Sequence, residues 1–117
     1  MNSLNHNQDI LDRTFQFAVR VTKLRSFLDS RPGTSVGSQV EEAQAAESAA
    51  DFISKMCIGL KEARETHYRL RILGAANLVR PTRLAPLIKE ADEIKRIAGA
   101  IIVRTKANAR AVNVRRR

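Results

Sequence analysis

Tryptophan is absent from this sequence, and aromatic side chains make up only 4% of its residues. A single cysteine, Cys57, excludes an internal disulfide and a thiolate metal site within one chain. No apolar run approaches the roughly 20 residues that span a bilayer, and the first ten residues lack the charged start and apolar middle of a secretion signal. We therefore expect a cytoplasmic protein with no membrane partner.

The composition that remains is that of one folded domain. With 44% hydrophobic and 28% charged residues, the composition is too apolar for a disordered polymer. A chain of 117 residues is also too short for a two-domain enzyme. Three prolines and five glycines leave long uninterrupted stretches. Apolar residues recur in these stretches every three or four positions, which predicts an all-α protein.

The first helix is predicted over residues 8–29, where one apolar face is widened by three further side chains. A turn at Arg31-Pro32-Gly33 should end it, because proline disfavours helical dihedrals in the residue before it. The predicted face carries Ile10, Leu11, Phe15, Ala18, Val21, Leu24 and Leu28, and the widening residues are Phe17, Val19 and Phe27.

The second and third helices are predicted on either side of a break near Ser48. Thr34 or Ser35 can cap the second helix, with Ser38 as an alternative start, and Ser48 stands at capping distance from Asp51. The third helix should cover residues 50–73. The expected apolar residues of the second helix are Val36, Val40, Ala43 and Ala46. The stripe along one side of the third helix comprises Phe52, Met56, Leu60, Ala63, His67, Leu70 and Leu73.

The fourth helix is predicted to begin at Thr82 or Ala85 and to fade after Arg104. Residues 108–117 show no usable apolar period, so we expect a basic disordered tail after a bundle domain at 1–107. Four helices joined by short loops should form an antiparallel up-and-down bundle. The predicted apolar residues of the fourth helix are Leu84, Leu87, Ile88, Ala91, Ile94, Ala98, Ile101 and Ile102.

The middle of the chain carries four recognisable stretches: GTSVG at residues 33–37, VEEAQA at 40–45, DFISK at 51–55 and LKEARET at 60–66. They resemble a bacterial four-helix-bundle family first noted as open reading frames inside intervening sequences of large-subunit ribosomal RNA, often labelled ribosomal-protein-like. The resemblance covers residues 10–104. It implies a ring-shaped homopentamer without enzymatic activity. A distantly similar group serves reverse transcriptases, which suggests RNA-related work by analogy.

Positive charge is concentrated in the second half of the sequence. Residues 1–60 hold six basic and seven acidic residues, whereas residues 61–117 hold fifteen basic and five acidic ones. Such a surplus favours polyanionic partners, and arginine binds phosphate through a planar fork. With few aromatics for base stacking, the expected contact is with RNA backbone and shape. The candidate nucleic-acid-binding residues are Arg69, Arg71, Arg80, Arg83, Lys89, Lys95, Arg96, Arg104, Lys106, Arg110, Arg115, Arg116 and Arg117.

No catalytic, cofactor or metal site is expected, and no small-molecule substrate. His67 stands two residues after Glu65 and five after Glu62, so the helical steps separate imidazole from carboxylates, and His6 lies near the N-terminus. Ser35 lacks triad companions, and Cys57 is expected to be buried. The polar residues of helices two and three are interpreted as a structural or subunit-interface network, comprising Glu41, Glu42, Glu62, Arg64, Glu65, His67 and Tyr68.

Two functional hypotheses remain open at this stage. The first is a homo-oligomeric bundle that binds RNA or a ribonucleoprotein through its basic surface. The second is a protein-interaction adaptor whose ring binds an acidic protein, without direct nucleic-acid contact.

Overall fold

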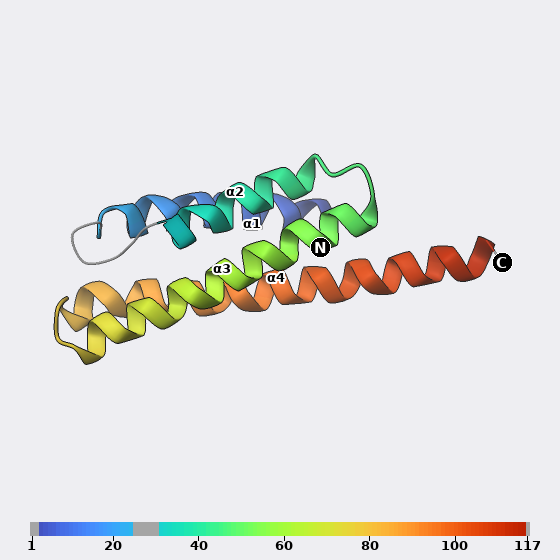
Figure 1. Cartoon of the computed structure of the whole chain (residues 1–117). Coiled ribbons are helices and arrows are strands. Elements are labelled where there is room, and N and C mark those ends of the chain that lie inside the picture. Colours follow the sequence, from blue (N-terminus) through green and yellow to red (C-terminus); the bar gives the residue numbers. More distant parts are fainter. Residues whose placement is uncertain (1–2, 25–30, 117) are drawn as a thin grey trace.

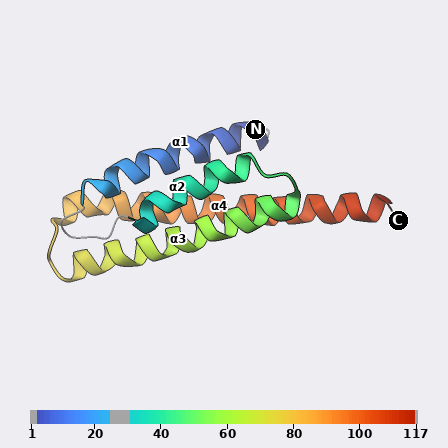
Figure 2. The ribbon, with the colours of Figure 1, turned by 45° about the horizontal axis from the view of Figure 1, so that its top comes forward.

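The computed structural model describes the backbone of residues 3–24 and 31–116, which form four helices and, within these residues, no strand. The helices are α1 (Ser3–Thr22), α2 (Arg31–Gln44), α3 (Ala49–Ala75) and α4 (Pro81–Arg116) (Figure 1). Each helix packs against the next, and α4 also packs against α1, so that the four surround one core (Figure 2). The all-α prediction is confirmed. None of the described helices is long and apolar enough to cross a membrane.

All four helices contribute the small aliphatic side chains that fill the core. Two buried threonine hydroxyls are also satisfied: Thr14 donates to the Ile10 carbonyl at 2.7 Å, and Thr66 donates to the Glu62 carbonyl at 2.9 Å. The apolar period of the sequence therefore located most of the core. Its buried hydrophobic residues include Ile10, Phe17, Val21, Leu24, Val36, Val40, Ala43, Met56, Ala63, Leu70, Leu73, Leu84, Leu87, Ala91, Ile94, Ala98, Ile101 and Ile102.

Helix α1 differs from its prediction in length and in one aromatic position. It ends at Thr22 rather than at Asp29, and the predicted apolar residues Phe27 and Leu28 lie outside the described part of the chain. Phe17 is fully buried, whereas Phe15, which was predicted on the core face, is 58% exposed. Two residues apart on a helix point in nearly opposite directions, so only one of these rings can face the core.

Helix α2 begins at Arg31, earlier than any of the three predicted starts. The predicted turn at residues 31–33 is wrong, because Pro32 is accommodated in the first helical turn, where its missing N–H has no intrahelical partner. Gly33 then packs directly on α1. A Cβ atom at Gly33 would lie 2.8 Å from Cγ1 of Val21, so the close approach of the two helices requires glycine here.

Helix α3 has well-defined ends. The predicted break at Ser48 is confirmed: its hydroxyl accepts a hydrogen bond from the Asp51 N–H at 3.0 Å and caps the helix. At the other end Asn77 takes a left-handed conformation, with φ of 57°. The N–H groups of Asn77 and Leu78 donate to the carbonyls of Gly74 and Leu73, an arrangement that closes a helix C-terminus.

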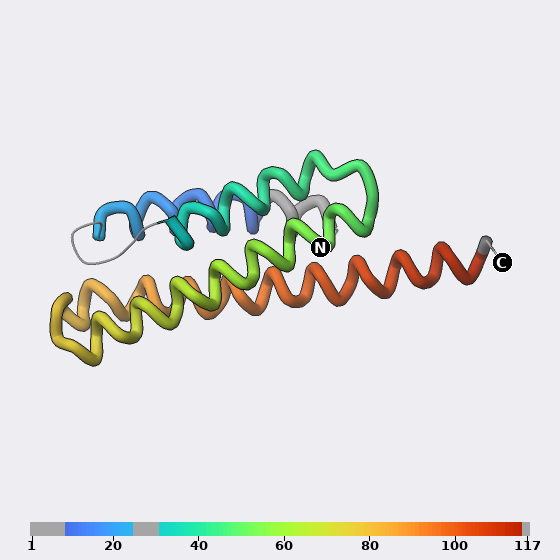
Figure 3. The backbone as a smooth tube through the Cα atoms, viewed as in Figure 1, coloured from blue at the N-terminus to red at the C-terminus, as the bar shows by residue number. Residues whose placement is uncertain are grey.

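Helix α4 continues well past its predicted end at Arg104. It runs to Arg116, through the residues expected to form a disordered tail. Neither proline nor glycine follows Gly99, and alanines, arginines and lysine in this stretch favour helix. Thr105 and Ala109 remain half-buried and continue the core-facing side. At 36 residues α4 is longer than the 27-residue α3, and it reaches beyond the other helices (Figure 3).

Candidate nucleic-acid interface

Most of the predicted nucleic-acid-binding cations fall into two groups, one near the start of α4 and one near its end. We define the loop-end cluster as Arg71, Arg80, Arg83 and Lys89, which are all exposed near the α3–α4 connection. We define the C-terminal helix as residues 104–116 of α4. From Arg83 to Arg104 the helix rises about 32 Å at 1.5 Å per residue. The single basic surface expected from the sequence is therefore divided.

Between the two groups, Asp92 lowers the net positive charge. Its carboxylate lies 2.8 Å from the Arg96 guanidinium and 3.7 Å from the Lys95 amine. On α3, Arg69 similarly donates to Glu65 at 2.7 Å, four residues away. Carboxylates of their own helices thus partly neutralise these three predicted cations. They therefore attract phosphate less strongly than unpaired cations do.

The C-terminal helix carries cations with no acidic residue beside them. The last acidic residue of the sequence is Glu93, eleven positions before Arg104. Within the side chains that the structure describes, 9–24 and 31–115, no carboxylate pairs with this segment. Arg104 and Arg115 share one side of the helix and Lys106 and Arg110 the roughly opposite side, so the segment is positive on two sides. The exposed cations of this segment are Arg104, Lys106, Arg110 and Arg115.

The two final predicted arginines lie at the edge of the described residues or beyond it. Arg116 is the last residue of α4 by its backbone, and its side chain is outside the described set. Arg117 lies outside the described residues altogether. Their predicted contact with nucleic acid stays a prediction from sequence.

A shallow groove separates α3 from α4 next to the loop-end cluster. It is lined by His67, Arg71, Ala85, Ile88, Lys89 and Asp92. Burial and the positive charge of Lys95 lower the pKa of His67 below its ordinary value, and Asp92 offsets part of this effect. His67 is therefore a neutral imidazole at pH 7, held in positively charged surroundings.

The predicted network on helices two and three is only partly assembled. Glu62 and Glu65 do lie together, in a hollow between α2 and α3 that Arg31, Ser35 and Arg69 also line. The other predicted members do not join them there. Glu41, Glu42, Arg64 and Tyr68 are exposed, and His67 lines the α3–α4 groove instead.

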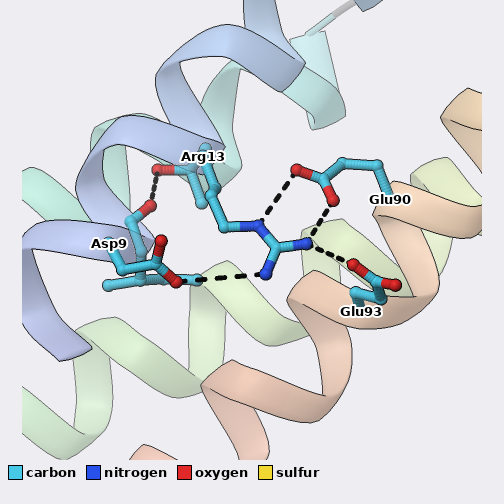
Figure 4. A network of polar contacts seen from close by, with 6 residues as sticks. Asp9, Arg13, Glu90 and Glu93 are labelled. Atoms are coloured by element: carbon cyan, nitrogen blue, oxygen red, sulfur yellow. Dashed lines mark hydrogen bonds and ion pairs between the residues drawn. The ribbon is translucent and has the colours of Figure 1, made fainter. Parts of the chain in front are cut away.

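The polar cluster that joins distant parts of the bundle was missed by sequence reasoning. Arg13 of α1 donates to both Glu90 and Glu93 of α4, with Nε of Arg13 3.1 Å from Oε2 of Glu90 (Figure 4). Asp9 lies 3.9 Å away on the same helix. The hydrogen bond to Glu90 raises the pKa of the Arg13 guanidinium, so this group stays charged. No local pattern distinguishes Arg13 from the other cations within the predicted first helix, residues 8–29, so the sequence carried no signal for this contact.

Residues with catalytic or metal-binding potential are dispersed. Among the described residues, no three His, Cys, Asp or Glu side chains are grouped as metal ligands would be. Cys57 is exposed, and its predicted burial is wrong because it stands beside Met56, which takes the core-facing position at that turn of α3.

The model of the 23S rRNA-intervening sequence protein family matches residues 6–100. The chain belongs to this family. The matched region ends before residues 104–116 of α4. The resemblance seen in residues 33–66 is thereby confirmed.

A solved structure supports the same relationship. The chain is similar to a crystal structure of a protein of unknown function from the S23 ribosomal protein family of Bacteroides thetaiotaomicron VPI-5482. The two are 33% identical, with a TM-score of 0.77, over 83% of this chain and 97% of that one. The search among curated proteins found no match. The family membership and the all-α, four-helix fold are therefore established.

Proposed function

We propose that this family member is a non-enzymatic, homo-oligomeric bundle that binds RNA or a ribonucleoprotein through phosphate contacts. The exposed cations of the C-terminal helix carry the proposal, because they offer a positive surface that no carboxylate among the described side chains neutralises. The loop-end cluster supplies a second positive region. The ribosomal RNA context in the family's description agrees with such a partner by analogy alone.

The proposed contact is with the RNA backbone. Among the described residues Tyr68 is the one tyrosine, and it lies on α3 with 59% of its surface exposed, whereas the C-terminal helix contains no aromatic residue. Base stacking on successive aromatic side chains, which single-strand readers use, has no basis there. Arginine and lysine side chains recognise phosphate spacing and helix shape instead.

We further propose that the helices alternate in direction and that the subunits assemble, with a pentamer as the expected state. Short connections and the contact of each helix with the next support the alternation. Exposed apolar side chains on α1 and α3 support a subunit contact, since such side chains usually mark interaction surfaces when they gather. These side chains are Phe15, Val19, Ile58, Tyr68 and Ile72.

Removal of residues 108–117 is the first test. Four of the cations go with them, so the slope of log affinity against log salt for an RNA hairpin should become shallower by about 3, at 0.7–0.9 per phosphate contact. A slope equal to that of the full chain would refute the role of this segment. Elemental analysis of the same preparation tests the absence of a stoichiometric metal.

A full-length variant separates lost charge from lost helix. Arg104→Gln, Arg110→Gln and Arg115→Gln together should flatten the slope by about 2–3 units. The matched control neutralises three exposed cations elsewhere, with Lys23→Gln, Lys61→Gln and Arg64→Gln. Equal flattening in both variants would show that only total charge matters.

One observation favours the adaptor as a second candidate. A groove between α1 and α2 is lined by Leu11, Phe15, Ala18 and Glu41, among others, and the ring of Phe15 is largely exposed in it. Such an apolar surface suits a protein partner. Excess RNA should displace that partner only if the two share a surface, so a competition experiment distinguishes the candidates.

A further inference from the structure

The α3–α4 groove brings an imidazole, two cations and an apolar floor into one place. His67 and Arg71 stand four residues apart on α3, so they share a side of that helix. Ala85, Ile88 and Lys89 lie on the facing side of α4. Ala85 and Ile88 supply the apolar part of this lining, which we call the apolar floor, and Arg71, Lys89 and His67 supply its basic part.

The electrostatic environment of the groove is positive. The charged groups that act on His67 are Arg71 from α3, and Lys95 and Asp92 from α4. Lys89 also lines the groove. Asp92 is the one carboxylate in this set, and it is already engaged by Arg96 and Lys95. Among the described side chains, none from α1 or α2 lines this groove.

We propose that this groove binds one nucleotide unit of an RNA, with its phosphate held by Arg71, Lys89 and the protonated ring of His67. The apolar floor at Ala85 and Ile88 takes the sugar or base face. This inference rests on the proposed RNA binding, and it adds a defined subsite to what would otherwise be a diffuse positive surface. A bare anion would leave the apolar floor uncovered, which favours a nucleotide.

His67 should take up a proton when RNA binds in the groove. In the free protein the neighbouring cations and burial keep His67 neutral, because they lower the pKa of His67. A bound phosphate cancels part of that positive field and favours the imidazolium, so it raises the pKa of His67. RNA affinity should then increase as pH falls, by up to about tenfold for each unit of pKa change.

The test measures affinity of the full chain for a short RNA hairpin at constant salt, between about pH 8 and about pH 5. The natural protein should bind more tightly toward the acidic end, and His67→Gln should lose this increase. The sequence holds two histidines, so His6→Gln is the matched control and should keep the increase. A pH profile unchanged by His67→Gln would overturn the assignment.

Histidine ring resonances give an independent readout. Addition of the hairpin should raise the pKa of His67, and inorganic phosphate alone should raise it much less. An unchanged pKa of His67 in the RNA complex would overturn the subsite, as would an equal rise with inorganic phosphate. Complete absence of RNA binding would instead refute the proposed function, whereas salt-dependent binding that ignores His67 would refute the subsite alone.

Discussion

Arg13 holds two carboxylates of α4 from a position on α1, and this single side chain joins the first and last helices. Its partners are 77 and 80 residues away in the sequence. The side chains of Arg13 and Glu90 are 25% and 18% exposed, so the interaction lies between a solvated surface pair and a buried one. No local pattern indicates a contact over such a separation.

Arg13→Met should reduce the free energy of unfolding by about 1–2 kcal/mol, because Glu90 and Glu93 lose their shared cation while the methionine keeps the packing of the aliphatic stem. Chemical denaturation at fixed protein concentration measures this change. Lys23→Met, at an exposed position after α1, makes the same substitution and should change stability little. Similar losses in both variants would contradict a specific role for the Arg13 pair.

His67 should make the free protein less stable as pH falls. Because its folded-state pKa is lowered, the unfolded chain binds more protons in the window between that pKa and the ordinary value of about 6.5. Stability from His67 is therefore present above that window and is lost as pH decreases through it. Denaturant midpoints across this range should vary less in His67→Gln. An identical pH dependence in the variant would contradict the account.

At the scale of elements, the contact of α2 with α1 depends on glycine at a position where helix propensity alone would favour alanine. Gly33 lies against Val21, whereas Gly99 on α4 has no side chain or backbone of another element within 4 Å of where its Cβ would stand. The two glycines share a helical setting and differ in surroundings.

Gly33 and Gly99 should respond in opposite ways to substitution by alanine. Gly99→Ala should stabilise the protein by roughly 0.5–1 kcal/mol through helix propensity. Gly33→Ala should destabilise it by about 1–2 kcal/mol, because the new methyl group overlaps Val21 and the gain in propensity offsets only part of that cost. Thermal unfolding compares the two directly. Stabilisation by both would show that α1 and α2 are not packed as described.

Helix ends show where sequence reasoning works and where it does not. Ser48 was correctly predicted as the cap of α3, because capping is a local interaction between a hydroxyl and the N–H three residues later. The start of α2 was missed because Pro32 is equally compatible with a turn and with a first helical turn. The extension of α4 was missed because beyond Ile102 the apolar period weakens, and alanine, arginine and lysine propensity maintains the helix.

At the scale of the whole molecule, the four-helix class and most of the core followed from periodicity, since buried positions recur every three or four residues. Periodicity did not predict which of Phe15 and Phe17 is buried, because α1 has apolar residues on both sides and packing decides which ring is enclosed. The candidate interface was predicted as a list of cations. Its division into two groups required the structure, because carboxylates such as Asp92 neutralise some of them.

The proposed RNA binding requires cations that are free to bind phosphate. The direct measurement is the affinity of the full chain for a structured RNA over a series of salt concentrations. With all six cations of residues 104–117 engaged on phosphates, the log–log slope should approach about −5. Affinity that does not change with salt, or RNA that fails to bind at low salt, would contradict it.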